Sequence, residues 1–362
     1  MTQTQTVTPA TAAAVGRALK RLAPYRPRRP YVPSLEGIQV AQGRWWVTDG
    51  HYAVHPVGDA TPLALPDGAW PLWDCVPLLR GDVPLQGVLE GGDRCHLQPG
   101  DAWVTRLGHD PVPGPAWLCD SAYAQDPLPR IPSDVWARIR TFVAQDSSRP
   151  ALTSLYLHVD ATGQLALVAT DGTMLARWST PGPYVVGRWG PGIRLQPLAL
   201  PPDAQGAVAY DGDTGLGVVW RSATLCLHHP LLPEPYPDYT QVLPPAIPPT
   251  VQYDAAAWAA LRAQIQAIQR AAPRRRWQVR LEGDEATWIT DTGDLVGRFP
   301  ALFGTTPYTL RVDGTRLAHC IHQLADQPTT CTLHGPEAPV VFQQPCAGGR
   351  LEVLLLPLRQ RY

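Results

Sequence analysis

The sequence predicts an α+β protein of three tandem domains, each a doubled unit of a helix followed by strands. A Thr-Asp motif returns along the chain as "WVTDG", "VATDG" and "WITDT", with Asp49, Asp171 and Asp291 spaced 122 and 120 positions apart. A chain of 362 residues is longer than a usual single domain, and its 41 prolines favour short strands and turns over long helices. The even spacing therefore indicates a threefold internal repeat.

Each repeat is expected to begin with an amphipathic helix. The three stretches start at Thr8, Pro132 and Asp254, and each repeats apolar residues at helical intervals. Each also offers a side chain that can accept a hydrogen bond from the first free backbone N–H groups, namely Thr8 or Thr11, Ser133 and Asp254. These helices mark where the three domains start.

A pair of strands that ends at the Thr-Asp motif follows each of these helices. The three stretches are "GIQVAQGRWWVTDG", "LYLHVDATGQLALVATDG" and "WQVRLEGDEATWITDT", and the alternation along "LYLHV" in the second indicates a half-buried strand. An aspartate after a strand can accept hydrogen bonds from backbone N–H groups of a turn, and a following glycine permits a positive φ. The motif is therefore expected to shape a turn rather than to catalyse a reaction.

A second helix, again followed by strands, is expected in each domain. It starts at Asp67 in the first domain and at Asp313 in the third, whereas prolines interrupt the middle copy near 195–206, which is barely helical. Domain boundaries fall in proline-rich stretches. The predicted domains are residues 1–128, 129–247 and 248–362.

Composition limits the classes of function. Residues 1–30 carry six cationic side chains and no acid on a chain of net charge −1, which suggests a localised anionic partner or, alternatively, a solvated helix face. The seven cysteines are scattered without a C-x-x-C pair, so they are expected to be reduced and buried. No leader or long apolar run is evident, and a cytoplasmic location without membrane contact is expected.

The sequence predicts no enzyme, no cofactor and no metal site. The phosphate-loop, nucleophile-elbow, zincin and dinucleotide motifs do not occur in it. His319, Cys320 and His322 share a helical stretch, and Cys331 and His334 follow on an expected strand. Residues three apart on a strand point to opposite faces, which disfavours a metal site there.

Four stretches, in order along the chain, resemble one protein family. "SSRPALTSLYLHVD", "LALVATDGTMLAR", "PYPDYTQVLP" and "LEVLLLPLR" are similar to segments of the bacterial DNA polymerase III β subunit, the DNA sliding clamp. The resemblance implies three DNA-clamp, or processivity-factor, domains in a crescent that pairs head to tail with a second copy to form a six-domain ring. Such a homodimer encircles double-stranded DNA without reading its sequence, and it tethers DNA polymerase, the clamp loader and other proteins that carry a clamp-binding motif.

An alternative from another class is a monomeric clamp-fold module, or decoy, that binds replication proteins without encircling DNA. The chain departs from the family pattern at Thr173 and Met174, where the family has His-Arg, and at Gln241, where it usually has arginine. These departures indicate a divergent member of the family.

The resemblance and the residue pattern together imply a set of DNA-facing cations. A sliding ring needs diffuse attraction to phosphates, which a few cations on each helix supply. Arg17, Lys20 and Arg21 are three and four positions apart and share one helix face. Taken singly, each such residue could instead be a solvated surface charge. The expected DNA-facing residues are Arg17, Lys20, Arg21, Arg29, Arg138, Arg140, Arg149 and Arg262.

The resemblance also implies an apolar groove for a partner peptide between the second and third domains. Its expected lining is Leu152, Thr170, Gly172, Thr173, Met174, Leu175, Pro237, Gln241, Val242, Leu354, Leu356, Pro357, Leu358 and Arg359. Because of the departures noted above, the groove is expected to be less basic and to bind the usual motif weakly or to prefer a dedicated partner. Taken alone, "LEVLLLPL" would also fit a buried final strand.

Ring closure is expected to use the edge strand around Ala102–Leu107 of one copy and the third domain of the other. The interface residues implied by the resemblance are Ala102, Val104 and Ile268.

Overall fold

The computed structural model of the chain describes nearly all of it after residue 124 and shorter segments before that. The described residues are 4–5, 12–27, 33–41, 44–49, 52–56, 68–73, 85–90, 94–99, 104–107, 124–146, 148–160, 162–232, 234–271, 277–290, 295–300 and 304–358. The chain forms two compact units, which we call the N unit and the C unit. The N unit comprises Met1–Ser133, Gly187–Trp189 and Leu198–Leu231, and the C unit comprises Asp134–Val186, Gly190–Pro197 and Leu232–Tyr362.

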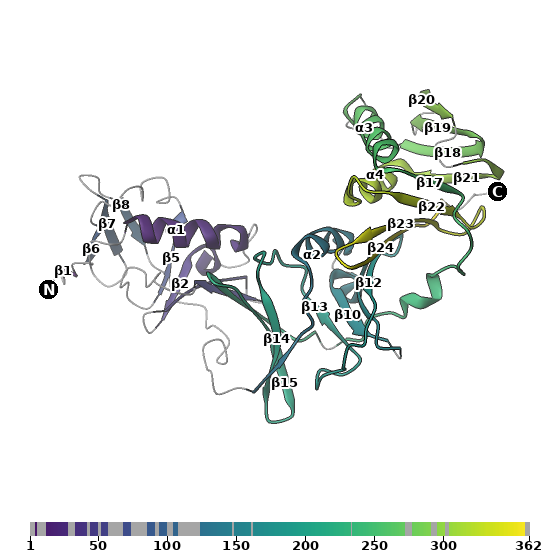
Figure 1. Ribbon diagram of the computed structural model, residues 1–362. Helices are drawn as coiled ribbons and strands as arrows, with labels where there is room; N and C mark the ends of the chain where they lie inside the picture. Colours follow the sequence, from purple (N-terminus) through teal and green to yellow (C-terminus); the bar gives the residue numbers. More distant parts are fainter. Residues whose placement is uncertain are drawn as a thin grey trace. The chain divides into compact units, whose positions relative to one another are not determined.

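The N unit contains an eight-stranded antiparallel sheet in the order β5, β2, β3, β4, β16, β15, β14 and β9 (Figure 1). The bounds are β2 (Ile38–Ala41), β3 (Arg44–Thr48), β4 (Ala53–Pro56), β5 (Gly68–Trp70), β9 (Ala124–Pro127), β14 (Gln205–Asp211), β15 (Thr214–Arg221) and β16 (Leu225–Pro230). At the centre, β4 and β16 join strands from distant parts of the sequence, with Leu225 opposite Pro56 and His228 opposite Ala53. This seam makes the first and middle repeats share one sheet.

Helix α1 (Ala12–Leu22) packs against β4 of this sheet. Its buried face consists of Val15, Ala18, Leu19 and Leu22, which recur at the helical spacing that the sequence predicts. The described part of the N unit also includes the 3-10 helices η1 (Ala23–Tyr25) and η2 (Pro33–Glu36), and a sheet in the order β1, β6, β7 and β8. The strands of that sheet are β1 (Thr4–Gln5), β6 (Leu85–Glu90), β7 (Arg94–Pro99) and β8 (Val104–Leu107).

The C unit has an eight-stranded antiparallel sheet of the same design, in the order β13, β10, β11, β12, β24, β23, β22 and β17. The bounds are β10 (Leu155–Val159), β11 (Leu165–Thr170), β12 (Met174–Thr180), β13 (Gly192–Leu195), β17 (Val251–Tyr253), β22 (Thr329–Leu333), β23 (Val340–Cys346) and β24 (Gly349–Leu355). Its central seam pairs β12 with β24, so the middle and last repeats share this sheet. Each half of the middle repeat is thus joined to a different neighbour.

A second, four-stranded sheet of the C unit has the order β20, β19, β18 and β21. The strands are β18 (Trp277–Gly283), β19 (Glu285–Thr290), β20 (Leu295–Pro300) and β21 (Thr306–Asp313). The remaining elements are α2 (Ser133–Ile139), η5 (Arg140–Phe142), η6 (Pro150–Thr153), η7 (Tyr239–Val242), α3 (Ala255–Ala271) and α4 (Gly314–Gln323).

Helices α3 and α4 lie side by side in the C unit (Figure 1). Asp254 accepts a hydrogen bond from the Ala257 N–H at 2.8 Å, and Asp313 accepts one from the Arg316 N–H at 2.9 Å. These contacts satisfy backbone donors that have no partner inside the helix, and they explain why both helices start where the sequence predicts.

Within the described residues, the predicted helices and strand pairs are confirmed with one exception. The predicted helix from Asp67 is wrong over its described part, because Gly68–Trp70 is β5, paired with β2. Pro71 removes a helical N–H donor, and pairing with a neighbouring strand outweighs local helix preference. The middle copy near 195–206, predicted to be barely helical because of its prolines, has no helix at all. The mixture of helices and antiparallel strands confirms the α+β class, while the division at 128 and 247 stays a prediction. No described helix combines the length and the apolarity that crossing a membrane requires.

Candidate functional site

The Thr-Asp motif of the middle repeat forms a tight turn between β11 and β12. Thr170 Oγ1 donates to the Met174 carbonyl oxygen at 2.6 Å. Asp171 Oδ1 accepts from the backbone N–H groups of Thr173 and Met174, both at 2.7 Å, and from the Thr173 hydroxyl at 2.7 Å. Gly172 supplies a φ of 88°, which side chains with a Cβ rarely adopt. The aspartate therefore fixes backbone geometry, as the sequence predicts.

The first copy of the motif repeats this arrangement in the N unit. Thr48 Oγ1 donates to the Tyr52 carbonyl, and Asp49 Oδ1 accepts from the Tyr52 N–H at 3.0 Å. The third aspartate, Asp291, lies outside the described residues. The structural interpretation of the motif is confirmed at both places where it can be seen.

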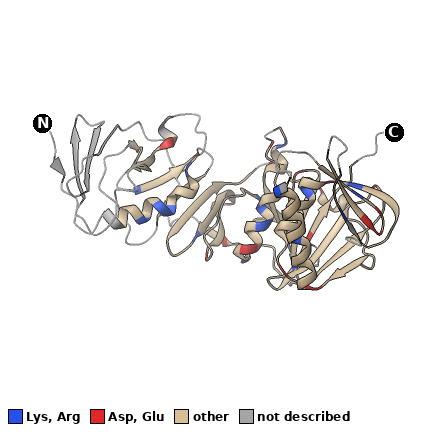
Figure 2. Ribbon diagram, turned by 90° about the horizontal axis from the view of Figure 1, so that it is seen from above, with Lys and Arg blue, Asp and Glu red and all other residues tan. Residues whose placement is uncertain are grey.

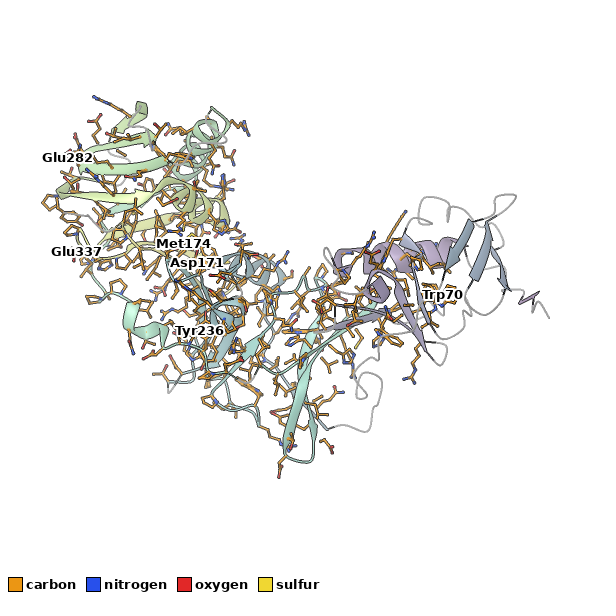
Figure 3. The ribbon with its side chains drawn as sticks, turned by 180° about the vertical axis from the view of Figure 1, so that it is seen from behind. Trp70, Asp171, Met174, Tyr236, Glu282 and Glu337 are labelled. Atoms are coloured by element: carbon orange, nitrogen blue, oxygen red, sulfur yellow. The ribbon has the colours of Figure 1, made fainter. Side chains whose placement is uncertain are left out.

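A cavity of about 340 Å³ lies beside the β11–β12 turn in the C unit. Asp171 of this turn and Met174, the first residue of β12, are labelled in Figure 3. The other walls come from η6, from η7 and from the end of β24. The lining consists of Arg149, Leu152, Thr170, Gly172, Thr173, Met174, Leu175, Pro237, Asp238, Tyr239, Val242, Leu354 and Leu356.

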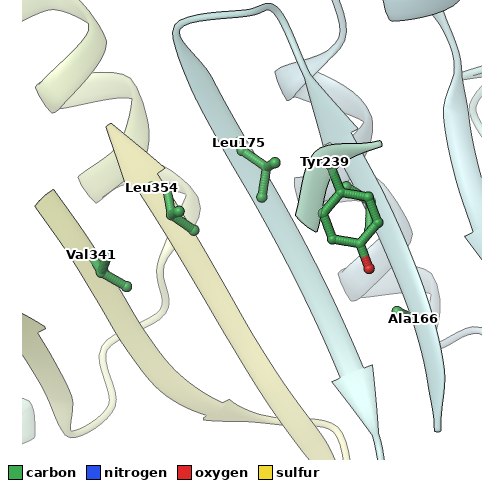
Figure 4. Close-up of a cluster of buried hydrophobic side chains, with 6 residues drawn as sticks. Ala166, Leu175, Tyr239, Val341 and Leu354 are labelled. Atoms are coloured by element: carbon green, nitrogen blue, oxygen red, sulfur yellow. The ribbon is translucent and has the colours of Figure 1, made fainter. Parts of the chain in front are cut away.

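The seam between β12 and β24 builds the floor of this cavity. Leu175 lies opposite Leu354 in the strand register, and the Leu356 N–H donates to the Thr173 carbonyl at 2.9 Å. Leu175, Leu354 and Tyr239 also belong to a buried apolar cluster, shown in Figure 4. The other members of the cluster are Ala166, Val168 and Val341. A packed core thus holds the floor rigid.

The rim of the cavity is mostly apolar and carries one cationic and one anionic side chain. Val242 and Leu356 keep 45% and 37% of their surface exposed, which is high for large apolar side chains. Arg149 and Asp238 are exposed. Hydrogen bonds from Thr240 to the Asp238 carboxylate hold the pKa of Asp238 below its usual value. Such a cleft suits apolar side chains of a short peptide, with polar groups at the ends to orient it.

Ten of the residues expected in the partner groove line this one cavity, and three described ones do not. Gln241 donates to the Asp238 carboxylate at 3.2 Å instead. The Leu358 N–H donates to the Arg311 carbonyl at 2.8 Å, and Pro357 is half-buried beside it. Arg359 lies outside the described residues.

The sequence reasoning did not place Arg149, Asp238 or Tyr239 in this groove. Arg149 was expected to face DNA, and only the fold shows that η6 brings it to the cavity. Asp238 and Tyr239 lie between Pro237 and Gln241 in the quoted "PYPDYTQVLP" stretch. The stretch itself was the available signal for them.

A second cavity of about 450 Å³ in the C unit shares Arg149 and Met174 with the first. The rest of its lining is Thr141, Val143, Ala144, Gln145, Asp146, Asp171, Thr315, Arg316 and His319. His319 lies 3.2 Å from the Thr141 hydroxyl, and burial lowers the pKa of this histidine. This second cavity is more polar than the first.

Helix α1 exposes the three cations that the sequence predicts on one face. Arg17, Lys20 and Arg21 are all exposed, and no acidic residue lies on this helix. In Figure 2, Lys and Arg, drawn in blue, recur along α1. The opposite face carries the buried apolar residues, so the helix separates charge from core.

The other expected cations lie in more varied surroundings. Arg138 pairs with Asp134 at 3.7 Å, and Arg262 forms an ion pair with Asp326. Arg140 contacts the Pro197 carbonyl at 3.5 Å. Arg149 lines the cavity, and Arg29 lies outside the described residues.

The residues expected at a subunit interface are only partly described. Val104 belongs to β8, which ends its sheet and is paired only with β7 among the described strands. Ile268 is 7% exposed and faces the core of its own unit. Ala102 lies outside the described residues.

Solved structures of bacterial sliding clamps match this chain over nearly its whole length, whereas no protein-family model and no curated protein matches it. A DNA polymerase sliding clamp from Caulobacter crescentus is 19% identical, and the match covers 99% of this chain and 100% of that chain at a TM-score of 0.71. A sliding clamp from Bartonella birtlesii bound to griselimycin is 16% identical, with the same coverage and a TM-score of 0.73. A sliding clamp from Bacillus subtilis is 14% identical, with 97% and 98% covered and a TM-score of 0.72. The chain has the fold of the bacterial DNA sliding clamps.

The match confirms the clamp fold that the four resembling stretches imply, while the three-domain division and the ring stay predictions. At such low identities most side chains differ between these proteins, so the clamp fold by itself assigns a role to no single residue. The roles must be argued from the cavity, the basic helix and the sheet edges described above.

Proposed function

We propose that this chain is a DNA sliding clamp, in which two copies close head to tail into a ring around duplex DNA. The observation that carries the proposal is the match to clamp structures along the full chain, with 99% of this chain and 100% of the relative covered. A protein of this kind acts by confinement, because a tethered polymerase stays at high effective concentration near the primer end. We therefore propose a binding function and no catalysis.

The basic face of α1 supports the contact with DNA. Arg17, Lys20 and Arg21 are exposed and have no acid on their own helix to neutralise them. Flexible cations attract phosphates without recognising bases, which allows a ring to move along the duplex. Arg138 and Arg262 contribute less in this proposal, because each is already paired with a carboxylate.

The cavity beside Met174 supports the contact with partners. Its floor is apolar, and Val242 and Leu356 remain exposed at its rim, ready to be covered by a short apolar segment of a DNA polymerase, a clamp loader or another replication protein. The adjoining second cavity, which shares Arg149 and Met174, gives room for polar residues of the same segment.

Sheet edges support the closure of the ring. Strand β8 in the N unit and strand β20 in the C unit each end a four-stranded sheet. Their outward backbone groups can pair with each other across two copies, which would also remove two edges that favour aggregation.

A monomeric clamp-fold module is the second candidate, and the ion pairs of Arg138 and Arg262 favour it by leaving fewer cations for DNA. Light scattering during size-exclusion chromatography distinguishes the two candidates. The ring predicts a mass of twice 39.5 kDa at micromolar protein, and a strict monomer would favour the module.

We propose that griselimycin, to which the Bartonella birtlesii clamp is bound in its solved structure, also binds in this cavity, and it therefore serves as the probe. In calorimetric titrations of the full chain, Met174→Ala combined with Leu356→Ala should weaken binding by more than ~1 kcal/mol, as expected for central anchor residues. Leu358→Ala is the matched control, since this leucine does not line the cavity. Equal affinity of the double variant and the unchanged chain would contradict the assignment of this cavity.

A further inference from the structure

Three potential metal ligands meet on one face of the N-unit sheet, at the seam between β4 and β16. Cys226 lies directly opposite His55 in the strand register, and His228 follows Cys226 by two positions. Because side chains alternate along a strand, Cys226 and His228 point to the same face, beside His55. Their ligand atoms all lie within 4.8 Å of one another.

The distances between these atoms fit a shared metal ion. Cys226 Sγ is 3.1 Å from His228 Nε2, and His228 Nε2 is 3.4 Å from His55 Nε2. In a tetrahedral zinc site, bond lengths of about 2.0–2.1 Å to nitrogen and 2.3 Å to sulfur separate two nitrogens by about 3.3 Å and a sulfur and a nitrogen by about 3.6 Å. The side chains are already close to that spacing.

Hydrogen bonding orients His55 as a ligand. Its Nδ1 lies 3.2 Å from the Pro56 carbonyl oxygen, which can only accept a hydrogen bond, so Nδ1 carries the proton. The lone pair of the ring is then on Nε2, which faces His228. A proton donated by the distal ring nitrogen to a backbone carbonyl is the usual arrangement for a histidine that binds a metal.

Without a cation between the three side chains, Cys226 and His55 both have His228 Nε2 as a hydrogen-bonding partner. His228 Nε2 can either donate one proton or accept through one lone pair, yet it faces the His55 lone pair and the Cys226 sulfur together. A cation at the centre would accept electron pairs from all three atoms at once.

We propose that His55, Cys226 and His228 bind one Zn²⁺ ion that fastens β4 to β16. One thiolate and two imidazoles are ligands that zinc prefers, and the fourth position remains for water or an anion. The ion links the first repeat to the middle repeat across the seam of the N unit. This proposal is independent of DNA binding, and it revises the sequence expectation of no metal site, because only the strand register brings His55 to residues about 170 positions away.

Metal titration of the full chain tests the proposal, with Co²⁺ and Zn²⁺ as the probes. After treatment with a chelator, Co²⁺ should bind with one ion per chain and give a thiolate-to-cobalt charge-transfer band in the near ultraviolet, which one equivalent of Zn²⁺ removes. Cys226→Ala should abolish the band. Loss of a residue that only hydrogen-bonds to a metal ligand weakens metal binding roughly 10- to 100-fold. His55→Ala removes a ligand itself and should therefore weaken Co²⁺ binding by more than that.

Cys346→Ala is the matched control, because this buried cysteine belongs to the C unit. It should leave the band and its intensity unchanged. If Cys226→Ala does not fold, the Co²⁺ affinity of His55→Ala tests the proposal instead, since His55 is only half-buried. A second measurement is the melting temperature of the unchanged chain, which Zn²⁺ should raise and the chelator should lower. Absence of a thiolate band in the unchanged chain, or the same band in Cys226→Ala, would overturn the proposal.

Discussion

At the scale of single residues, Asp171 and Gly172 show how a short motif determines the wall of a cavity. Asp171 Oδ1 accepts three hydrogen bonds, and Gly172 adopts a positive φ that closes the turn. A Cβ at position 172 would lie 3.0 Å from Arg149 Nη1 and 3.6 Å from Leu152 Cδ1, both of which line the cavity. Backbone conformation and cavity shape are therefore coupled at this glycine.

Gly172→Ala should destabilise the C unit by about 1 kcal/mol, the cost of a left-handed conformation for a residue with a Cβ. If griselimycin occupies the cavity, as proposed above, the substitution should also weaken its binding. Gly348→Ala is the matched control, since Gly348 has a φ of 76° and a Cβ there meets no described atom within 4 Å. Chemical denaturation and calorimetry measure the two effects. Equal loss of ligand affinity in both variants would contradict the coupling.

His158 makes the stability of the C unit depend on pH. Its Nε2 lies 2.6 Å from the Tyr239 hydroxyl, and burial lowers its pKa, with Arg177 adding to the shift and Asp160 opposing it. The unfolded chain takes up a proton near pH 6.5, whereas the folded chain does so only at lower pH. The stabilising contribution of neutral His158 is therefore complete above pH 6.5 and is lost as the pH falls below it.

Below pH 6.5, the free energy of unfolding of the unchanged chain should fall more steeply than that of His158→Gln, by up to about 1.4 kcal/mol per pH unit. Glutamine keeps a hydrogen-bonding group near Tyr239 but does not titrate. Denaturant titrations of both proteins at a series of pH values give the comparison. Identical slopes would show that His158 is not responsible.

At the scale of elements, the sequence predicted the helices better than the partners of the strands. Val15, Leu19 and Leu22 reveal the buried face of α1 by spacing alone, and Asp254 reveals the start of α3 by its capping chemistry. The pairings of β4 with β16 and of β12 with β24 could not be predicted, since they join residues more than 150 positions apart. The metal cluster was missed for the same reason.

The sequence predicted most residues that line the candidate cavity, but not the charged residues at its rim. The resemblance named ten lining residues because the stretches that carry it are those that meet at the β12–β24 seam. The placement of Arg149 and Asp238 at the rim depends on side-chain positions that no local pattern encodes.

Edge strand β8 should be sensitive to proline if it closes the ring. In an antiparallel pair, successive residues alternately direct their N–H groups toward and away from the neighbouring strand, which here is β7. Thr105 and Arg106 are consecutive, so the N–H group of one faces β7 and the N–H group of the other faces away from it. The proline substitution that removes the N–H facing away from β7 should give a monomer that keeps its secondary structure. Light scattering and circular dichroism check this, and a dimer in both variants would exclude β8 as the closing edge.

At the scale of the whole molecule, the distribution of charge matters more than its total. The net charge is −1, yet α1 exposes three cations and no acid. On a nearly neutral protein, a localised basic face attracts DNA only when that face is turned toward the phosphate backbone. The effect on DNA binding should therefore depend on which cations are changed.

Reversing Arg17, Lys20 and Arg21 to Glu should lower DNA affinity at low salt and flatten its dependence on salt concentration. The matched control reverses Arg130, Arg298 and Arg350, which are exposed residues outside the helices and give the same change in net charge. Fluorescence anisotropy with duplex DNA at several salt concentrations measures both. An equal loss in the two triple variants would assign the effect to net charge alone.

The proposed clamp function requires a closed ring around DNA, and retention of the protein on circular DNA tests this requirement most directly. The protein is loaded onto a nicked circular plasmid with the clamp loader of its source organism, and gel filtration follows at a salt concentration that removes simple phosphate contacts. A ring predicts that the protein stays with the circular plasmid and is released when a restriction enzyme cuts it once. Equal retention on circular and linear DNA, or no retention on the circle, would contradict encirclement.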